Sequence, residues 1–423
     1  TNQRFEQVKQ HIHDGVITNS HIVQAARKAS RRRAQDRWGW RSEYWLPLLG
    51  SDALSDIRHF VIDFLRKDCS DHFYQSVAGA RLTALSKPDN RGIRPIGITD
   101  VLRKLAGRIL VILYRDHIRD ALISKNGRVL QFGVGFSHGA QMCAMAAQEH
   151  LRLNPTHAIF SLDLKNAFNC VDRAAIARGI NRLGEAKGRA MLGFFLAMYS
   201  DNNPLSYFLR DGTRESVHAT TGVTQGCVLG SVFFCLAIQP IMEEALEATL
   251  VKDVHAYCIA DDINLAAEPE QLIRAAERLQ KGLNDADLTV KKIDVLLGPR
   301  CRHIDPAELG ALEGKINIID TSEGIDVGPG RDNASGARIV GVPVGSTEYI
   351  KDFVGDTVNK HRARLNHIVQ FGHAGHTQEA LMLLWQCARP RIVFLLQCIP
   401  YHIAPEAFDD SHRDLIDAFA RIV

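Results

Sequence analysis

The pattern of apolar and polar positions divides the chain into a helical start, a mixed centre and a helical end. Residues 1–70 follow a helical period that is interrupted around 37–50, RWGWRSEYWLPLLG. Residues 81–118 predict a strand, a turn, a second strand and an amphipathic helix. From residue 347 onward the pattern is largely helical again, which predicts a domain boundary near residue 346.

The centre predicts strands and helices in succession. The apolar segment 157–164, HAIFSLDL, predicts a strand with Asp163 near its end, followed by amphipathic helices. Residues 205–221 predict a hairpin, and a long helix then precedes a strand pair that turns at Asp261–Asp262. Residues 299–337 end in a stretch rich in Gly, Asp and Ser, which predicts a loop or insertion.

Composition restricts the class of protein. The 423 residues are 46% hydrophobic and carry a net charge of only +3, so sizeable cores are expected and a nucleic-acid surface has to be local. Nine cysteines, odd in number and without a C-x-x-C pair, predict free thiols in an intracellular, reducing compartment. No apolar run approaches the ~20 residues that span a bilayer, which predicts no membrane partner. Thr1 in place of Met predicts a fragment, a processed form or a recombinant product.

One segment has the chemistry of nucleic-acid binding. Residues 27–41, RKASRRRAQDRWGWR, hold seven Arg or Lys residues against one acid, Asp36, and contain two tryptophans. Basic side chains neutralise phosphates, and aromatic rings stack on unpaired bases. The candidate residues are Arg31, Arg32, Arg33, Arg37, Trp38 and Trp40. A solvated helix face with a tryptophan anchored in the core is an equally good interpretation.

Three aspartates carry the candidate chemistry. Asp163 closes one predicted strand, and Asp261 and Asp262 occupy the turn of the strand pair, after the small residue Ala260. If this hairpin lies beside the first strand, three carboxylates converge, and they repel one another unless cations neutralise them. Two Mg²⁺ ions about 3.5–4 Å apart would neutralise the charge and clamp an in-line phosphoryl transfer. The plainer interpretation is that Asp-Asp is a good turn dipeptide.

Three blocks in register resemble the reverse transcriptases, most closely those of non-LTR retrotransposons. SLDLKNAFNCVDR (161–173) is similar to the family's first carboxylate motif, GVTQGCVLGSVFF (222–234) to its GVPQGSVLGPLLF block, and IADD (259–262) to its F/Y-A-D-D box. The resemblance covers about residues 80–300. It implies an RNA-directed DNA polymerase, a nucleotidyltransferase that extends a primer 3′-OH with dNTPs along an RNA template.

The resemblance implies an α+β fold, a right-hand polymerase with fingers and palm, whose antiparallel sheet packs on helices, and a mostly helical thumb. We therefore expect an N-terminal helical extension with candidate RNA-binding residues, then fingers, a palm with an insertion at about 299–337, and the thumb, over 1–79, 80–156, 157–346 and 347–423. The implied partners are an RNA template, a DNA primer or target DNA, dNTPs and a larger ribonucleoprotein. The nucleus is favoured as the compartment, without excluding the mitochondrion.

The resemblance also implies the metal site. Asp163 and Asp261 match the principal metal ligands, with Asp262 beside them, and the main-chain carbonyl of Leu164 completes the shell. The implied cofactor is a pair of Mg²⁺ ions, with Mn²⁺ as a substitute.

Five residues match the family's contacts with the incoming nucleotide. Lys87 and Arg94 match the residues of the fingers that grip the triphosphate, and Phe168 matches the steric gate that leaves no room for a 2′-hydroxyl. Gln225 and Gly226 match the contact with the templating base pair, where glycine allows a backbone approach that a side chain would block.

The chain departs from the family pattern at several positions. Thr224 and Ser231 stand where Pro is usual, and we expect both to loosen the loop. LTVKKIDVLL resembles the family's lysine motif, whose lysine is a candidate acid for protonating pyrophosphate, but lacks its Asn and hydroxyl residue. Lys291 and Lys292 are the candidates for this role, and Ile293 at the hydroxyl position weakly favours Lys292. That both are ordinary surface lysines is an equally good interpretation.

Two alternatives to a reverse transcriptase remain open at this stage. An RNA-templated RNA polymerase would share the palm and the metals, but the aromatic residue at 168 argues against it. A domesticated, non-catalytic scaffold that binds RNA within a ribonucleoprotein is favoured by the irregular lysine motif and the modest charge. The intact carboxylates argue against the scaffold.

Overall fold

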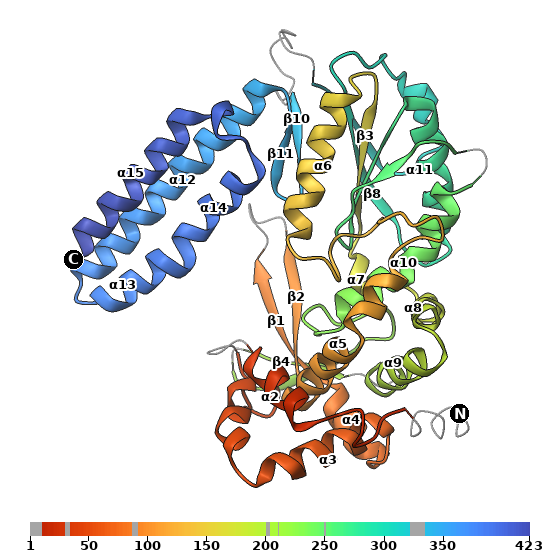
Figure 1. The fold of residues 1–423 in the computed structure, drawn as a ribbon, viewed down its shortest axis with the longest axis vertical. Helices are drawn as coiled ribbons and strands as arrows, with labels where there is room; N and C mark the ends of the chain where they lie inside the picture. The colour runs from red at the N-terminus through yellow and green to blue at the C-terminus, as the bar shows by residue number, and fades with distance from the viewer. Residues whose placement is uncertain are drawn as a thin grey trace. The chain divides into compact units, whose positions relative to one another are not determined.

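The computed structural model describes residues 11–29, 34–86, 92–199, 204–209, 211–248, 251–321 and 335–423 (Figure 1). The chain forms two compact units that alternate along the sequence. The first consists of Thr1–Gly135, Leu164–Ala245 and Lys281–Thr289. The second consists of Phe136–Asp163, Leu246–Gln280 and Val290–Val423.

The first unit is mainly helical. Its α-helices are α2 (Asn19–Arg27), α3 (Ala53–Arg66), α4 (Asp71–Ala78), α5 (Val101–Ala121), α7 (Ala167–Cys170), α8 (Arg173–Ile180), α9 (Glu185–Met198) and α10 (Gly230–Leu246). The 3₁₀ turns are η1 (Ser42–Gly50) and η3 (Asn181–Leu183). The helices with the largest buried faces are α5 and α10, and Phe233, Phe234 and Leu236 of α10 are fully buried.

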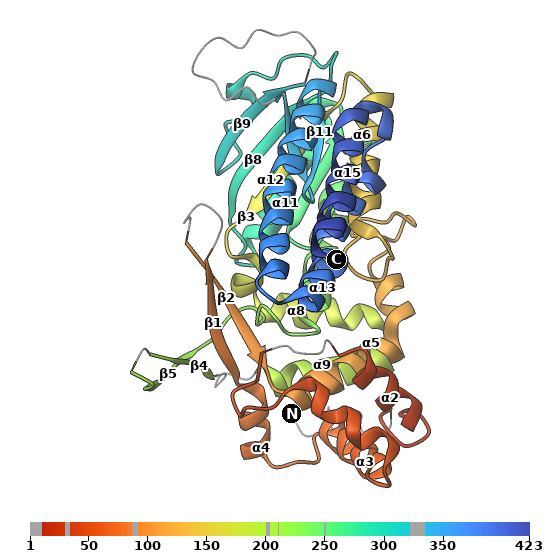
Figure 2. The ribbon, with the colours of Figure 1, turned by 90° about the vertical axis from the view of Figure 1, so that its left-hand side faces the viewer.

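A four-stranded sheet of the first unit has the order β2-β1-β4-β5. Its strands are β1 (Ala80–Ser86), β2 (Ile93–Thr99), β4 (Pro204–Phe208) and β5 (Arg214–His218). The β1–β2 and β4–β5 pairs are antiparallel, whereas β1 and β4 are parallel. Figure 2 shows β5 at the outer edge of this sheet, and all five of its residues are exposed.

The second unit contains a five-stranded sheet with the order β6-β7-β3-β8-β9. Its strands are β6 (His255–Ala256), β7 (Asp262–Ala267), β3 (Ala158–Leu164), β8 (Val290–Leu297) and β9 (Lys315–Asp320). The sheet is antiparallel from β6 to β3 and parallel between β8 and β9. Five of the six residues of β7 are buried, which is the pattern of a strand covered on both faces.

Helices and a hairpin complete the second unit. They are α6 (Gly139–Leu153), α11 (Pro269–Asn284), which continues into the first unit, η4 (Pro306–Leu309) and the antiparallel strands β10 (Gly336–Ile339) and β11 (Val342–Gly345). The C-terminal helices are α12 (Thr347–His373), α13 (Thr377–Leu383), the π-helix η5 (Leu384–Ala388), α14 (Arg389–Cys398), η6 (Tyr401–Ile403) and α15 (Pro405–Ile422).

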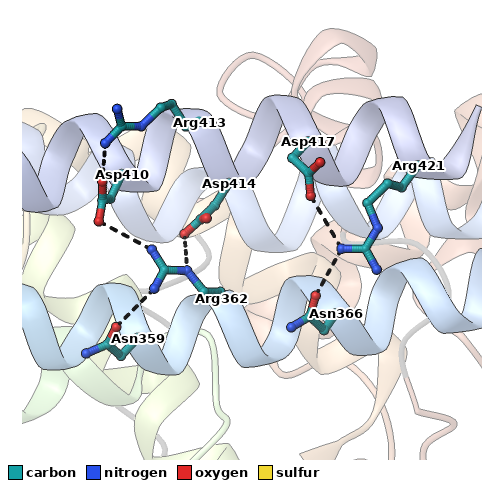
Figure 3. Close-up of polar contacts among 8 residues, drawn as sticks. All are labelled: Asn359, Arg362, Asn366, Asp410, Arg413, Asp414, Asp417 and Arg421. Atoms are coloured by element: carbon teal, nitrogen blue, oxygen red, sulfur yellow. Dashed lines mark hydrogen bonds and ion pairs between the residues drawn. The ribbon is translucent and has the colours of Figure 1, made fainter.

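Helices α12 and α15 pack against each other along their lengths (Figure 1). The buried residues of α12 recur every three or four positions and form one apolar stripe: Ile350, Val354, Val358, His361, Leu365, Val369 and Gly372. Beside this stripe, Arg362 of α12 reaches Asp414 at 2.8 Å and Asp410 at 3.4 Å on α15, as Figure 3 shows. Arg421 of α15 likewise reaches Asn366 of α12 at 3.3 Å. These half-exposed contacts fix the register of the two helices more than they add stability.

The predicted element order is confirmed over most of the described residues, and the mixed helices and sheets confirm the α+β class. Residues 299–337 differ from the expected loop, because 306–309 form η4 and 315–320 form β9. The β-branched run in KINIID is the signal for β9, and its parallel pairing with β8 makes it an edge of the main sheet. The predicted turn at 88–92 and the GPG of the insertion lie largely or wholly outside the described residues. Among the helices of the described residues, none is long and apolar enough to cross a bilayer.

Two buried aspartates meet at the start of α5. Asp36, 2% exposed, accepts the backbone N–H of Val101 at 3.2 Å, and Asp100, 7% exposed, caps the helix by accepting the N–H of Leu102 at 2.8 Å. Burial, followed by the charge of Asp36, raises the pKa of Asp100 to about 6 against the opposing effect of the Leu102 hydrogen bond. The folded state therefore favours a protonated Asp100.

Asp100→Asn should remove a pH dependence of the folding free energy. The folded protein keeps the Asp100 proton up to about pH 6, whereas the unfolded chain releases it near pH 3.8, so the free energy of unfolding falls as the pH rises between these values. The fall amounts to about 3 kcal/mol. Asn still caps the helix but does not titrate. Urea unfolding of both proteins from pH 4 to pH 7 measures the difference, with Asp172→Asn at the N-cap of α8 as the matched control. Parallel curves for wild type and Asp100→Asn would contradict the assignment.

Candidate active site

Backbone pairing between β3 and β7 brings the aspartates together. The register places Asp163 directly opposite Asp262. Directly opposed residues project from the same face of a sheet, with Cβ atoms about 4.5–5.5 Å apart. The hairpin that carries Asp261 and Asp262 therefore does lie beside the strand that ends at Asp163.

The hairpin turns in two residues, Ala260 and Asp261. The N–H of Ile259 donates to the carbonyl of Asp262 at 2.9 Å, and the N–H of Asp262 donates back to Ile259 at 3.0 Å. Ala260 has a φ of +51°, a left-handed conformation that costs a non-glycine residue about 1–2 kcal/mol. Such strain is concentrated at functional sites, and here it fixes Asp261 in the turn next to Asp262.

The three carboxylates interact electrostatically. Partial desolvation, followed by the charges of Asp261 and Asp163, raises the pKa of Asp262. The side chain of Asp163 is 59% exposed, and its Oδ2 lies 3.5 Å from the Nζ of Lys291. The repulsion anticipated from the sequence is therefore present, and one lysine offsets part of it.

The donor chemistry of the three carboxylates suits divalent ions. Three carboxylates are the hard oxygen ligands that Mg²⁺ and Mn²⁺ prefer, and cross-strand pairing holds two of them on one face. In their present side-chain conformations, no three His, Cys, Asp or Glu residues within the described part of the chain close around a common point. The donor set thus fits a divalent ion, and its side chains have to turn toward one another to hold it.

The two candidate lysines lie in different surroundings. They are neighbours on β8, so their side chains point to opposite faces of the sheet. Lys291 faces Asp163, whereas Lys292 donates to Asp294 at 2.7 Å and is held there. The weak preference for Lys292 drawn from the sequence is therefore not supported by its position.

In the first unit, Gln225 and Gly226 are packed against strand β2. The carbonyl of Gln225 accepts the N–H of Gly97 at 2.8 Å. Gly226 has a φ of +113°, and a Cβ added to it would lie 2.6 Å from the carbonyl oxygen of Gly97. The close approach that requires glycine here is therefore made by the chain's own strand β2.

Phe168 lies next to the same loop. The carbonyl of Phe168 accepts the N–H of Val223 at 2.7 Å, and its ring stacks on Phe234 of α10 with centroids 4.9 Å apart. The residue is only partly buried, so it is not an ordinary core residue. Arg94 is exposed on β2, three residues before Gly97, and Lys87 lies outside the described residues.

Residues that no motif indicated hold this loop in place. Buried Arg103 of α5 donates to the carbonyl of Ala78 at 2.6 Å and lies 4.7 Å from the ring of Tyr199. Tyr199 accepts the N–H of Thr224 at 3.3 Å. The loop is thus tethered at Thr224, contrary to the expectation that replacing Pro loosens it, because threonine supplies an N–H that proline lacks. Nothing local in the sequence pairs these residues.

The N-terminal candidates divide between described and undescribed residues. Arg31, Arg32 and Arg33 lie outside the described part of the chain. Trp38 and Trp40 are 50% and 52% exposed, so neither is anchored in a core. The core-anchor interpretation of these two tryptophans is therefore wrong.

Comparison with known proteins supplies one match. A family model described as Reverse transcriptase (RNA-dependent DNA polymerase) matches residues 85–296, just over half of the 423 residues. The matched segment contains the three carboxylates, both lysines of β8, and the Gln225–Gly226 loop. Among curated proteins, no relative matches the chain.

Gly226→Ala should destabilise the protein. Its positive φ and the approach of Gly97 leave no room for a Cβ, so we expect a loss of about 1–3 kcal/mol in urea unfolding. Gly107→Ala is the matched control, because Gly107 lies within helix α5 and its added Cβ would make only ordinary contacts at 3.6–3.7 Å with Val228 and Leu229. We expect that control to be neutral or more stable than wild type. Equal stability of the two variants would show that Gly226 does not approach Gly97 of β2 as closely as described.

Proposed function

This chain belongs to the reverse transcriptase (RNA-dependent DNA polymerase) family, and from this premise we propose that it extends a primer 3′-OH with dNTPs by two-metal-ion nucleotidyl transfer. Membership makes it an RNA-directed DNA polymerase, a nucleotidyltransferase that uses an RNA template and a nucleic-acid primer. The observation that supports the finer mechanism is the β3–β7 register, which sets Asp163 opposite Asp262 beside the Asp261 turn. The three motif blocks support the non-LTR retrotransposon type.

Reverse transcriptase domains use divalent ions, and we propose two Mg²⁺ ions here, with Mn²⁺ as a substitute. Asp163, Asp261, Asp262 and the main-chain carbonyl of Leu164 would hold them. When bound, such ions neutralise the carboxylates, lower the pKa of the primer hydroxyl and stabilise the pyrophosphate leaving group. The interaction among the three aspartates supports this proposal. Burial, followed by the charges of Asp261 and Asp163, raises the pKa of Asp262, so there is negative charge for cations to offset.

The protein's own residues have separate tasks in this proposal. Phe168 lies under the sugar of the incoming nucleotide and excludes a 2′-hydroxyl, for which the partly exposed ring stacked on Phe234 is suitable. The backbone at Gln225 and Gly226 supports the templating base pair. Arg94, exposed on β2, binds the triphosphate together with Lys87.

Lys291 is the proposed acid for the pyrophosphate. Its Nζ lies 3.5 Å from Asp163 and its side chain is 65% exposed, so it is near the carboxylates and free to move with the leaving group. A positioned acid of this kind contributes about 10²–10⁴-fold to rate. Lys292 is held by Asp294 instead.

The wider setting follows from the same premise. We propose a DNA primer or target DNA and a larger ribonucleoprotein as partners, with Arg31, Arg32, Arg33, Arg37, Trp38 and Trp40 as nucleic-acid contacts outside the catalytic centre. All nine cysteines are free thiols, which supports an intracellular, reducing compartment such as the nucleus.

Asp261→Asn should abolish primer extension. Losing one carboxylate removes several kcal/mol of transition-state stabilisation, a fall on the order of 10³-fold in rate. The assay is extension of a DNA primer on an RNA template with dNTPs and Mg²⁺. The matched control is Asp253→Asn, an exposed aspartate of the second unit with a φ of +53°, a conformation that Asn adopts readily. A second readout is the thermal shift with MgCl₂, which we expect for wild type and not for Asp261→Asn.

Extension that survives Asp261→Asn would refute the proposed metal site. An inactive wild type without a Mg²⁺-dependent thermal shift would instead favour a non-catalytic scaffold. Incorporation of NTPs in place of dNTPs would favour an RNA polymerase.

Lys291→Gln and Lys292→Gln distinguish the two candidate acids. We expect Lys291→Gln to lower kcat about 10²-fold and to flatten the alkaline limb of the pH–rate profile, because the group that protonates pyrophosphate is lost. Lys292→Gln should instead act mainly on stability, because it removes the ion pair with Asp294 and leaves that carboxylate with only its hydrogen bond from Asn317. The pH–rate profile separates a chemical from a structural effect. The reverse ranking would assign the role to Lys292.

A further inference from the structure

An exposed aromatic and basic surface lies in the first unit, outside the residues assigned to catalysis. We name it the aromatic platform and define it as Arg37, Trp38, Trp40, Tyr44 and Arg214. Its three aromatic residues are about half exposed: Trp38 by 50%, Trp40 by 52% and Tyr44 by 45%. Trp40 and Tyr44 contact each other edge to face, with centroids 5.9 Å apart. Large rings held half in water are characteristic of a binding surface.

The turn that presents the tryptophans is rigid. One carboxylate oxygen of buried Asp36 accepts the N–H groups of both Trp38 and Trp40, each at 2.9 Å. Its other oxygen accepts the N–H of Val101 at the start of α5. The two rings are thus attached to a helix terminus and are preorganised, which lowers the entropy lost when a ligand binds.

Two arginines from distant segments gather at Trp38. The guanidinium of Arg37 lies 4.5 Å from the centroid of the Trp38 ring, and that of Arg214 lies 6.0 Å from it. Arg214 belongs to the exposed edge strand β5 and is anchored by donating to Ser206 of β4 at 3.1 Å. A cation–π contact explains why each arginine lies near the ring. It does not explain why two cations, which repel each other, lie near the same ring.

Acids among the described residues offset only part of the charge of Arg37. Among the described residues, neither Arg37 nor Arg214 forms an ion pair. The Nε and Nη1 atoms of Arg37 are buried without a hydrogen-bond partner, so a ligand can reach only the rest of its guanidinium. The nearby acids Asp36 and Asp100 are buried and accept backbone N–H groups. Burial, then the charge of Arg214, lowers the pKa of Arg37 against the opposing charges of Asp100 and Asp36, so the two guanidiniums repel each other. An anion between them would relieve this repulsion.

We propose that the aromatic platform binds a single-stranded segment of the RNA template, with bases stacked on Trp38 and Trp40 and phosphates bound by Arg37 and Arg214. Stacking on rings together with arginine–phosphate pairing is the chemistry of single-strand binding. Exposed rings suited to base stacking beside two cations favour a nucleic acid over a folded protein partner. The choice of RNA rests on the proposed function, because the template is the single strand that such a polymerase handles.

The β4–β5 hairpin is therefore a functional part of the platform. It supplies Arg214 from a segment far from Trp38 in the sequence, and the β1–β4 pairing brings that segment to the N-terminal region of the first unit. The site is composite, and neither segment alone contains both the ring and the second cation.

The test measures binding of a labelled oligouridylate of about 15 nucleotides, a length within the usual site size, to the full chain by fluorescence anisotropy. We expect Trp38→Ala and Arg214→Gln each to weaken binding on the order of tenfold. Arg214→Gln should also lower the slope of log K against log salt by about one. Arg152→Gln is the matched control, because Arg152 is exposed and already paired with Glu149 at 2.6 Å, and it should bind as wild type.

Intrinsic fluorescence gives a second readout. The chain has four tryptophans, and saturating oligouridylate should quench the emission of the wild type. Trp38→Phe should lose part of this quenching while keeping a stackable ring and an unchanged melting temperature. An oligothymidylate of the same length should bind with similar affinity, because the platform contacts base faces and phosphates.

Unchanged affinity and quenching in Trp38→Ala and Arg214→Gln would overturn the proposal. Binding of oligothymidylate but not of oligouridylate would also overturn it, because it would exclude template RNA. Binding of neither oligomer would overturn it as well and would indicate that the rings form a protein-binding surface. Asp261→Asn separates this proposal from the catalytic one. That variant should bind oligouridylate as wild type does, and platform binding can fail while extension remains sensitive to Asp261→Asn.

Discussion

The antiparallel pairing of β3 with β7 is the constraint on which the rest of the site depends. The register that opposes Asp163 to Asp262 is set by apolar pairs behind it, Phe160 with Leu265 and Leu162 with Ile263, all of them buried. A slip of one residue would turn Asp262 to the other face of the sheet and bury a charge. Burial of the apolar side chains therefore holds together carboxylates that repel one another, and Lys291 offsets part of their charge.

In the first unit, packing likewise holds the Gln225 loop in place. Gly97 and Gly226 permit strand β2 and the Gln225 loop to approach at backbone distance. Arg103 and Tyr199, both buried, hold the other side of that loop. The residues proposed to meet the nucleotide are thus placed by neighbours that never touch it. This arrangement is the support that a preorganised site needs.

Asp36 connects the N-terminal segment to α5. Its buried carboxylate satisfies the first N–H of the helix and two N–H groups of the tryptophan turn together. The only acid in a segment of seven basic residues is therefore occupied by backbone N–H groups, and its charge offsets only part of that of Arg37. The segment thus has a local excess of basic residues, although the chain as a whole carries only +3.

The sequence by itself determined the order of most helices and strands, because the hydrophobic period is a local property. The three motif blocks that contain Asp163, the Gln225–Gly226 pair and Asp261–Asp262 could likewise be read from local spacing. The sequence also indicated that Asp163 and the Asp261–Asp262 turn belong together, through the family resemblance. Tertiary structure decided which lysine lies at Asp163. Adjacent residues on β8 point to opposite faces of the sheet, so Lys291 reaches Asp163 whereas Lys292 reaches Asp294. Tertiary structure alone made 315–320 an edge strand and brought Arg214 to Trp38. These contacts join segments far apart in the chain, and packing, which no local pattern encodes, selects them.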